Sequence, residues 1–270
     1  MSTRIGMLCF SPTTTTKTIC QAVAEGMGER EPYMLDMTLP DSRKTIMAKA
    51  NTAANTLDHV IVGAPVYSGK LPRQVLECLS VLNGHHTPCS AIVVYGNREY
   101  GIALYTMVEI LVENGFAVKA AGAFIGQHSY SDIVPVALGR PDESDLTIAR
   151  TFGVNTLDAC KDLDLHDVPR QHDKYSNSDT YTAIKPTYRE RLCIHCGKCS
   201  KACPIAAISS ETGSYVTRAS KKQCIGCMAC VYNCRQKARV AKVNPVVKMV
   251  MKRLFRDEQH ERKEPLVIVA

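Results

Sequence analysis

Residues 193–204 read CIHCGKCSKACP, and residues 224–234 read CIGCMACVYNC. Both runs place four cysteines at the spacing C-x2-C-x2-C-x3-C, so one pattern occurs twice in a single chain. The chain has 13 cysteines in 270 residues, and eight of them belong to these two runs. The other five have no regular spacing and are expected to be small buried hydrophobes: Cys9, Cys20, Cys78, Cys89 and Cys160.

The spacing of the two runs is suited to iron–sulfur chemistry. Three thiolates of one run can wrap a [4Fe–4S] cube while the fourth reaches away to a second cube. The expected ligands of one cluster are Cys193, Cys196, Cys199 and Cys234, and those of the other are Cys224, Cys227, Cys230 and Cys203. Zinc is the alternative, because CxxC pairs also bind it, but two four-cysteine runs of identical spacing lie far outside typical zinc patterns.

Over about residues 186–243 this segment resembles bacterial two-cluster ferredoxins. It departs from them after the last cysteine, where Arg235 stands in place of the expected proline. The resemblance implies a small α+β domain with a pseudo-twofold pair of short helices and hairpins. We read His195, which lies between two of the cysteines, as a surface residue.

Charge divides the chain at nearly the same place. Residues 1–165 hold 13 Lys/Arg against 17 Asp/Glu, whereas residues 166–270 hold 20 against 9. This asymmetry predicts separate domains. We expect a first domain over 1–164, a polar linker over 165–185, the cysteine-rich domain over 186–243 and a C-terminal amphipathic helix and tail over 244–270.

The first domain alternates apolar strand-like runs with helical patterns. Five strands are predicted at 4–10, 33–37, 59–65, 90–96 and 117–126, with helices at about 17–28, 44–56, 71–83, 101–115 and 143–162. Regular alternation predicts an α/β fold, a doubly wound five-stranded parallel sheet covered on both faces. Its expected order is 2-1-3-4-5, with a ligand site at the C-terminal strand ends.

Three loops lie at that predicted edge. The first, SPTTTTK at 11–17, leads directly into a helix whose free amides can bind a phosphate; the alternative is that one threonine caps the helix and the others are solvated. APVYSGKLP at 64–72 follows the third strand. YGNREYG at 95–101 follows the fourth, and GQHSYSD at 126–132 adds His128, either a flavin or substrate contact or a loop hydrogen-bonder.

With these loops the segment from 3 to 162 resembles flavodoxins, and this resemblance implies bound FMN. Thr14 stands where that family usually has glycine, so a positive φ there would be strained. Tyr67 and either Tyr100 or Tyr95 are the candidate ring partners, because the chain has no tryptophan. The residues expected around FMN are Ser11, Thr13, Thr14, Thr15, Thr16, Pro65, Val66, Tyr67, Ser68, Gly69, Tyr95, Gly96, Asn97, Arg98, Tyr100 and Gly101.

Together the two halves predict an electron-transfer flavoprotein with FMN and two [4Fe–4S] clusters. It is expected to pass electrons between a low-potential external carrier, the clusters and FMN. The alternative is a flavin-dependent reductase of a small molecule such as a quinone or a free flavin. A carrier should expose its flavin edge on a flat surface, whereas a reductase should have a pocket over the flavin. A third alternative is that FMN has been lost, with Thr14 as the marker.

The basic surplus of the second half predicts an acidic redox partner, such as a ferredoxin or flavodoxin, attracted electrostatically. Nucleic acid is not expected, since no groove-reading motif accompanies the charge. Without a signal peptide or a membrane-spanning run, we expect a cytoplasmic protein. The amphipathic segment 245–263 is expected to cover the body or a homodimer mate, with a membrane surface as the alternative.

Overall fold

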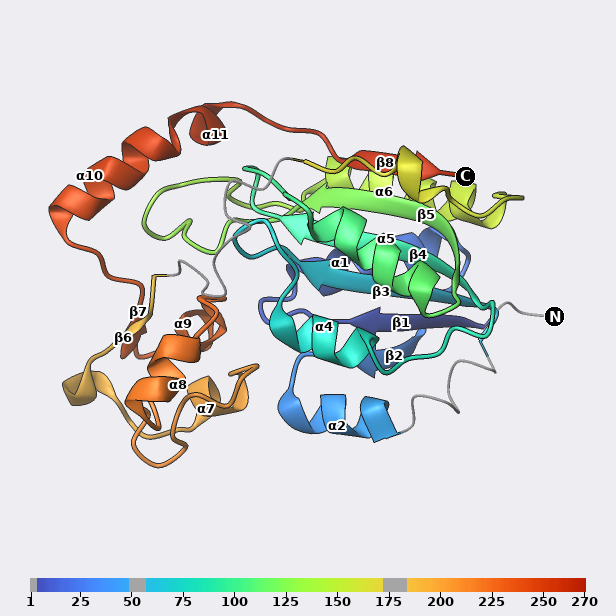
Figure 1. The fold of residues 1–270 in the computed structure, drawn as a ribbon. Coiled ribbons are helices and arrows are strands. Elements are labelled where there is room, and N and C mark those ends of the chain that lie inside the picture. Colours follow the sequence, from blue (N-terminus) through green and yellow to red (C-terminus); the bar gives the residue numbers. More distant parts are fainter. Residues whose placement is uncertain (1–3, 49–56, 172–183) are drawn as a thin grey trace.

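The structure, a computed structural model, describes residues 4–48, 57–171 and 184–270. The second half of the helix predicted over 44–56 and most of the linker predicted over 165–185 lie outside the described residues. Figure 1 shows a sheet domain flanked by helices and, beyond the carboxyl ends of its strands, a smaller domain of short elements. The described chain thus contains an α/β sheet region and a smaller region of short elements around the two cysteine runs.

The central sheet has the order β2-β1-β3-β4-β5-β8. The first five strands are parallel and confirm the predicted 2-1-3-4-5 order. The sheet is nevertheless six-stranded, because β8 pairs antiparallel with β5 through Ala120–Ala123. The strands are β1 (Ile5–Cys9), β2 (Tyr33–Asp36), β3 (His59–Pro65), β4 (Pro88–Tyr95), β5 (Ala117–Ile125) and β8 (Leu266–Val269).

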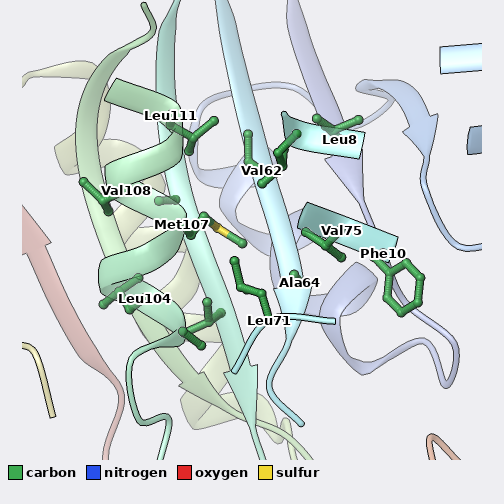
Figure 2. Close-up of a cluster of buried hydrophobic side chains, with 14 of the residues drawn as sticks. Leu8, Phe10, Val62, Ala64, Leu71, Val75, Leu104, Met107, Val108 and Leu111 are labelled. Carbon is green, nitrogen blue, oxygen red and sulfur yellow. The ribbon is translucent and has the colours of Figure 1, made fainter. Parts of the chain in front are cut away.

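Helices cover both faces of the sheet (Figure 1). Side chains alternate along each strand, so Leu8 and Phe10 face one core and Met7 and Cys9 the other. Figure 2 shows the first core, in which Met107 and its neighbours in α5 pack on β3 and β4. The helices of this face are α2 (Pro40–Ala48), α4 (Arg73–Leu79) and α5 (Ala103–Glu113), and those of the other are α1 (Thr15–Gly26) and α6 (Glu143–Leu157).

The cysteine-rich domain is built from short elements around its two runs. They are β6 (Thr187–Tyr188), α7 (Lys198–Lys201), α8 (Arg218–Gln223), α9 (Ala229–Tyr232) and β7 (Arg239–Val240). Strands β6 and β7 pair antiparallel. Helices α7 and α9 occupy corresponding places in the two runs, as the internal repeat predicts.

The cysteine-rich domain is docked onto the sheet domain rather than tethered beside it. Ile225, Cys227 and Ala229 are buried and belong to the same hydrophobic core as β3, β4 and α5. Arg43 of α2 donates from Nη2 to the carbonyl oxygen of Pro204 at 2.8 Å, directly after Cys203. The two domains therefore share one core.

The C-terminal segment links the two domains a second time. Helix α10 (Pro245–Leu254) confirms the predicted amphipathic helix, and α11 (Arg256–His260) follows it. Met251 and Phe255 are buried, whereas Val246, Met249 and Leu254 remain exposed. The chain then returns to the sheet as β8. The predicted tail after the helix therefore ends in a strand, because Leu266–Val269 forms one edge of the sheet.

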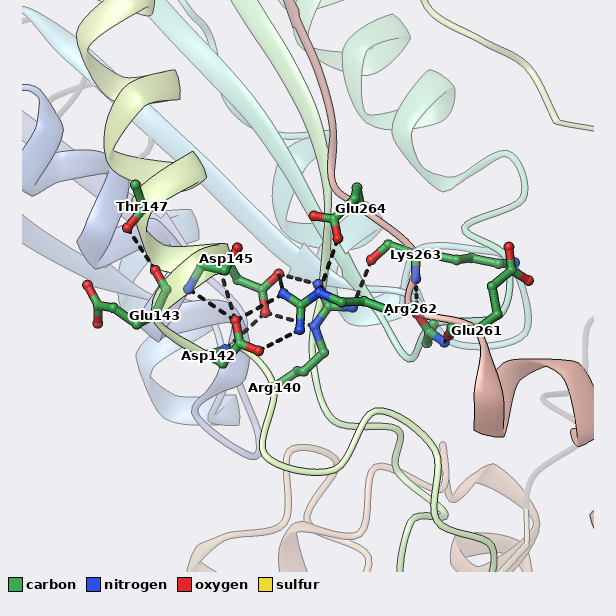
Figure 3. Close-up of polar contacts among 11 residues, drawn as sticks. Arg140, Asp142, Glu143, Asp145, Thr147, Glu261, Arg262, Lys263 and Glu264 are labelled. Carbon is green, nitrogen blue, oxygen red and sulfur yellow. Dashed lines mark hydrogen bonds and ion pairs between the residues drawn. The ribbon is translucent and has the colours of Figure 1, made fainter.

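A polar clasp fastens this returning segment to the loop before α6 (Figure 3). Arg262 donates to both carboxylate oxygens of Asp142, at 2.6 and 3.1 Å. Beneath it, Arg140 makes a two-bond ion pair with the fully buried Asp145 and donates to the carbonyl of Lys263 at 2.8 Å. Asp145 also accepts from the backbone N–H of Asp142, which closes a capping box at the start of α6.

Asp145 is expected to be essential to this clasp. The Asp145→Ala change would leave Arg140 buried without its partner, and breaking such a pair costs about 3–5 kcal/mol. Glu143→Ala, on the same helix, is the matched control: Glu143 pairs with Arg150 at the surface, where an ion pair contributes about 0–1 kcal/mol. Urea unfolding of both variants would measure the two losses. Equal losses would contradict the assignment of Asp145 as the buried anchor.

Candidate functional site

A cavity of about 380 Å³ lies at the C-terminal ends of the parallel strands. The loops after β1, β3, β4 and β5 all contribute to its wall, as the strand order predicts for a doubly wound sheet. Many of the residues predicted from sequence line it: Thr13, Thr15, Pro65, Val66, Tyr67, Ser68, Gly69, Tyr95, Gly96, Arg98 and Gly101. Ser11, Thr14, Thr16, Asn97 and Tyr100 do not line it.

The threonine loop presents unpaired donors at the start of α1. Within the described chain no acceptor meets the backbone N–H groups of Thr15 and Thr16, and the buried Oγ1 of Thr16 has no hydrogen-bond partner. Ser11 braces the loop, since its Oγ accepts from the backbone N–H of Lys17 at 3.0 Å. Free amides and a buried hydroxyl at a helix N-terminus are suited to an anionic group.

Thr14 has a left-handed backbone, with φ 70° and ψ −21°. Sequence analysis identified this position as the one where a positive φ would be strained, because the Cβ of a non-glycine residue crowds the backbone there. The loop adopts this conformation with threonine in place. The strain is therefore local to the turn that presents the free amides.

Some of the predicted aromatic residues line the cavity, and one is buried behind its wall. Tyr67 and Tyr95 line the cavity, whereas Tyr100 is buried behind Tyr95, with the ring centroids 5.6 Å apart in an edge-on arrangement. Of the two alternatives that the sequence left open beside Tyr67, only Tyr95 faces the cavity. Gly96 also lines the cavity. Its backbone lies so close to His128 that a Cβ on Gly96 would be 2.5 Å from Cδ2 of the imidazole.

Asn97 has a different role from the one predicted. Its side-chain N–H₂ donates to the carbonyls of Glu258 and Glu261, at 3.0 and 2.7 Å, and its Oδ1 accepts from the backbone N–H of Lys263. Asn97 therefore binds the C-terminal segment instead of facing the cavity. Nothing in the sequence of the loop indicates this, because the partner lies about 160 residues away.

His128 lies in the cavity wall as a neutral imidazole. Burial, with a smaller effect of Arg98, lowers its pKa to about 4. Nδ1 accepts from the backbone N–H of Tyr130 at 3.0 Å, so the ring proton is assigned to Nε2. The ring is held between Tyr130 and Phe255, with centroids 5.2 and 5.1 Å away.

The far wall of the cavity comes from outside the sheet domain. Ile225 and Gly226, which lie between Cys224 and Cys227, reach it from the cysteine-rich domain. Helix α10 covers it with Val247 and Met251, followed by Phe255. Sequence reasoning missed these residues, because the docking of one domain on another leaves no periodicity or spacing to detect.

Four cysteines line a small apolar cavity inside the second domain: Cys203, Cys224, Cys227 and Cys230. This is the crossed set, one cysteine from the first run and three from the second. Burial raises the pKa of Cys227, and the sulfurs of the other three raise it further. Burial also raises the pKa of Cys230 to about 12, an effect that the charge of Arg239 opposes. In the other set, Cys193, Cys199 and Cys234 are half-buried and Cys196 is exposed.

The backbone repeats across the two runs. Residues at corresponding positions share left-handed conformations: His195 and Gly226 at φ 52° and 68°, Gly197 and Met228 at 68° and 63°, and Ala206 and Lys237 at 50° and 51°. Backbone N–H groups point at sulfur, from Ala207 to Cys203 at 3.3 Å and from His195 to Cys193 at 3.4 Å. Such donors favour the thiolate form and influence the potential of an iron–sulfur cluster.

The described residues contain no group of three or more His, Cys, Asp or Glu side chains gathered around a single metal ion. A [4Fe–4S] cube is held differently, because each of its cysteines binds a different iron atom. The buried, apolar setting of Cys203, Cys224, Cys227 and Cys230 and the amides directed at sulfur fit such a cube. No helix in the described ranges is long and apolar enough to cross a membrane.

Comparison with known proteins matches part of the chain to a protein family. Residues 168–239 match a family model described as a 4Fe-4S dicluster domain. Among solved structures, the chain is similar to a flavodoxin from the domain Archaea (16% identity, TM-score 0.39, 57% of this chain and 96% of that one). It is also similar to oxidised flavodoxin 1 from Bacillus cereus (18%, 0.41, 58% and 98%) and to the apo form of an NADH:FMN oxidoreductase (16%, 0.41, 64% and 97%).

These likenesses are distant, so the flavodoxin-like fold is assigned from the strand order of the chain itself. A search of curated proteins finds no match. The chain thus combines a sheet domain of flavodoxin-like strand order with a segment that matches a 4Fe-4S dicluster model.

The strain at Thr14 leads to a testable expectation. Thr14→Gly should raise the free energy of unfolding by about 1 kcal/mol, because glycine adopts the left-handed region without the Cβ clash. Thr18→Gly, in the first turn of α1, is the control and should lower stability, since glycine is the poorer helix former. Thermal unfolding of both variants measures the two effects; destabilisation by Thr14→Gly would contradict the strained geometry.

Proposed function

We propose that the protein binds FMN in the cavity and two [4Fe–4S] clusters in the cysteine-rich domain, and that it transfers electrons between an external redox protein and the flavin. The observation that carries this proposal is the shared wall: Ile225 and Gly226 lie between two cluster cysteines and also line the flavin cavity. The two proposed cofactor sites are thus separated by a single loop of chain.

The cavity offers each part of FMN a matching surface. The free amide of Thr15 would hold the phosphate, with Thr13 beside it in the cavity wall; the unpaired N–H and Oγ1 of Thr16 lie directly after them at the start of α1. Tyr67 and Tyr95 would flank the ring system. The Nε2–H of His128 is a neutral donor in the same wall, well suited to a polar edge of the ring. Asn97 is left out of this assignment because the C-terminal segment engages its amide.

The two ligand sets differ in their surroundings. Cys203, Cys224, Cys227 and Cys230 would hold the flavin-side cluster, and Cys193, Cys196, Cys199 and Cys234 would hold the outer cluster. When bound, iron–sulfur cubes supply single-electron transfer, and FMN supplies chemistry of one or two electrons. The chain buries the flavin-side set among apolar side chains and leaves the outer set closer to solvent. An external donor would therefore deliver its electrons to the outer cluster.

The surface around the outer set is basic. Arg189, Arg191, Lys198 and Lys201 are exposed on either side of Cys193 and Cys196; the acids beside them are Glu190 and Glu211, whose carbonyl contacts the His195 ring. Ile194, directly after Cys193, is 63% exposed. An apolar contact within a basic rim favours an acidic redox protein such as a ferredoxin or flavodoxin, because opposite charges speed the encounter.

A second candidate function follows from the roof of the cavity. Val247, Met251 and Phe255 cover it with apolar side chains, and His128 and Tyr130 lie below. A carrier that hands electrons to another protein from a flat flavin edge would not need this cover. The covered cavity favours the alternative in which the flavin reduces a small molecule, such as a quinone, fed by the external carrier.

Electron delivery to the flavin should depend on the flavin-side set. In anaerobically purified full-length protein, Cys227→Ser should remove this cluster and abolish rapid reduction of FMN by a reduced ferredoxin, followed by flavin absorbance in a stopped-flow instrument. Cys160→Ser is the matched control, because Cys160 is exposed and outside both runs. Rapid FMN reduction in a Cys227→Ser protein shown to lack that iron would contradict the proposed route.

The same assay separates the two candidate functions. With a quinone added in excess, a reductase oxidises many equivalents of reduced ferredoxin per chain, whereas a carrier stops once its own cofactors are filled. The covered cavity predicts repeated turnover. A single filling would favour the carrier instead.

The basic rim should govern docking of the donor. Lys198→Glu with Lys201→Glu should slow electron uptake from an acidic ferredoxin by about tenfold at low salt, and high salt should slow the wild type similarly. Arg4→Glu with Arg30→Glu, at two exposed positions of the sheet domain, is the charge-matched control. Uptake that is insensitive to both salt and the Lys198/Lys201 reversal would contradict this docking surface.

A further inference from the structure

Helix α10 has two apolar faces, and the body of the protein covers only one of them. Residues four apart lie on the same face of a helix. Met251 and, directly after the helix, Phe255 are buried over the cavity. The second face, here called the exposed stripe, consists of Val246, Met249, Val250 and Leu254, all of them exposed. Figure 1 shows α10 at the outer margin of the molecule, where this stripe meets solvent.

The exposed stripe is bordered by positive charge. Lys248, Lys252 and Arg256 follow one another at four-residue spacing along one side of the stripe, and all three are exposed. In the part of the chain that the structure describes, none of them forms an ion pair. The surrounding sequence supplies no acid either, since residues 212–256 hold 11 Lys/Arg and no Asp or Glu. An exposed apolar face thus lies within a surface of one sign of charge.

The helix is formed and anchored without any partner on its exposed stripe. The side chain of Asn244 caps it by accepting from the backbone N–H of Val247 at 2.8 Å, and Pro245 occupies the first helical position. Met251 and Phe255 hold it against the cavity. Docking through the exposed stripe would therefore order little chain, which keeps the entropic cost of binding low.

The chemistry of the stripe favours a lipid surface over a protein. A second copy of the chain would bring two acid-free basic helices together, and like charges repel. Protein interfaces are enriched in aromatic side chains, whereas the exposed stripe has only valine, methionine and leucine. A bilayer with anionic headgroups needs neither aromatic residues nor a matching shape, because aliphatic side chains enter below the headgroups while Lys and Arg pair with them.

We propose that α10 docks the protein on an anionic phospholipid surface, with the exposed stripe below the headgroups and Lys248, Lys252 and Arg256 paired with phosphate. The helix has ten residues, half of the roughly 20 that crossing a bilayer requires, so it lies in the plane of the surface. This docking goes beyond the proposed function, and it needs neither flavin nor iron.

One consequence concerns the substrate, and this consequence alone rests on the proposed function. The helix that carries the exposed stripe also covers the cavity with Val247 and Met251. Docking on lipid therefore places the roof of the cavity at the membrane surface. An apolar substrate such as a quinone partitions into the acyl region of a bilayer, so it would reach the covered cavity from the lipid side.

The test is flotation of anaerobically purified full-length protein with vesicles of phosphatidylcholine, alone or mixed with an equal part of phosphatidylglycerol. The wild type should float with the mixed vesicles and remain unbound with phosphatidylcholine alone. Val246→Ser with Leu254→Ser should weaken binding at least about tenfold, because less apolar surface enters the lipid. Lys248→Gln with Lys252→Gln should weaken it by about tenfold, and high salt should act in the same direction.

Matched controls change the same residue types elsewhere. Val154→Ser with Leu157→Ser alters two exposed apolar side chains of α6 in the sheet domain. Arg4→Gln with Arg30→Gln removes two exposed charges from that domain. Both control pairs should float like the wild type. Circular dichroism checks that every variant is folded, which is expected because all the altered side chains are exposed.

Each outcome decides the matter. A wild type that does not float with the mixed vesicles overturns the proposal, and so does undiminished flotation of the stripe variant or equal binding to phosphatidylcholine alone. If the stripe variant instead loses an acidic ferredoxin or a second copy, the surface binds protein and the proposal fails. Flotation needs no electron transfer, so a protein that floats but lacks iron or flavin refutes only the proposed function.

Discussion

The loop that carries Cys224 and Cys227 is buried in the core of the sheet domain, and the rest of the site depends on this contact. Ile225 is 3% exposed among side chains of β3, β4 and α5. Fully burying one such side chain contributes about 2 kcal/mol, and the bond from Arg43 to the Pro204 carbonyl fixes the other run of the domain. Because the same loop lines the cavity, the contact that joins the domains also brings the two proposed cofactor sites together.

The C-terminal segment makes this arrangement hard to open. It leaves the cysteine-rich domain, covers the cavity with α10, binds Asn97 and returns to the sheet as β8. β8 also covers the edge of β5, which would otherwise present unpaired backbone groups. The clasp of Arg262 on Asp142, above the buried pair of Arg140 and Asp145, fixes the return path. The C-terminal segment thus returns to the sheet domain after the cysteine-rich domain.

Local patterns predicted most of the fold and one of the two crossed cysteine sets. Apolar runs alternating with helical patterns predicted β1 to β5, and the spacing of the two cysteine runs predicted the crossed set that lines one cavity. The missing glycine at Thr14 correctly identified the strained turn. Contacts between segments far apart in the chain could not be predicted from the sequence. LVIV at 266–269 is an apolar run whose partner strand lies far away in the chain: Val269 pairs with Ala120, 149 residues before it. Asn97 likewise takes its role from carbonyls of the C-terminal segment, 161 and 164 residues away.

Cofactor analysis of the anaerobically purified chain tests the central claim most directly. Two cubes and one flavin predict about eight iron atoms, with matching acid-labile sulfide, and about one FMN per chain. Zinc in place of iron, or iron without flavin, would contradict the account, because the shared wall at Ile225 and Gly226 would then join no pair of redox centres.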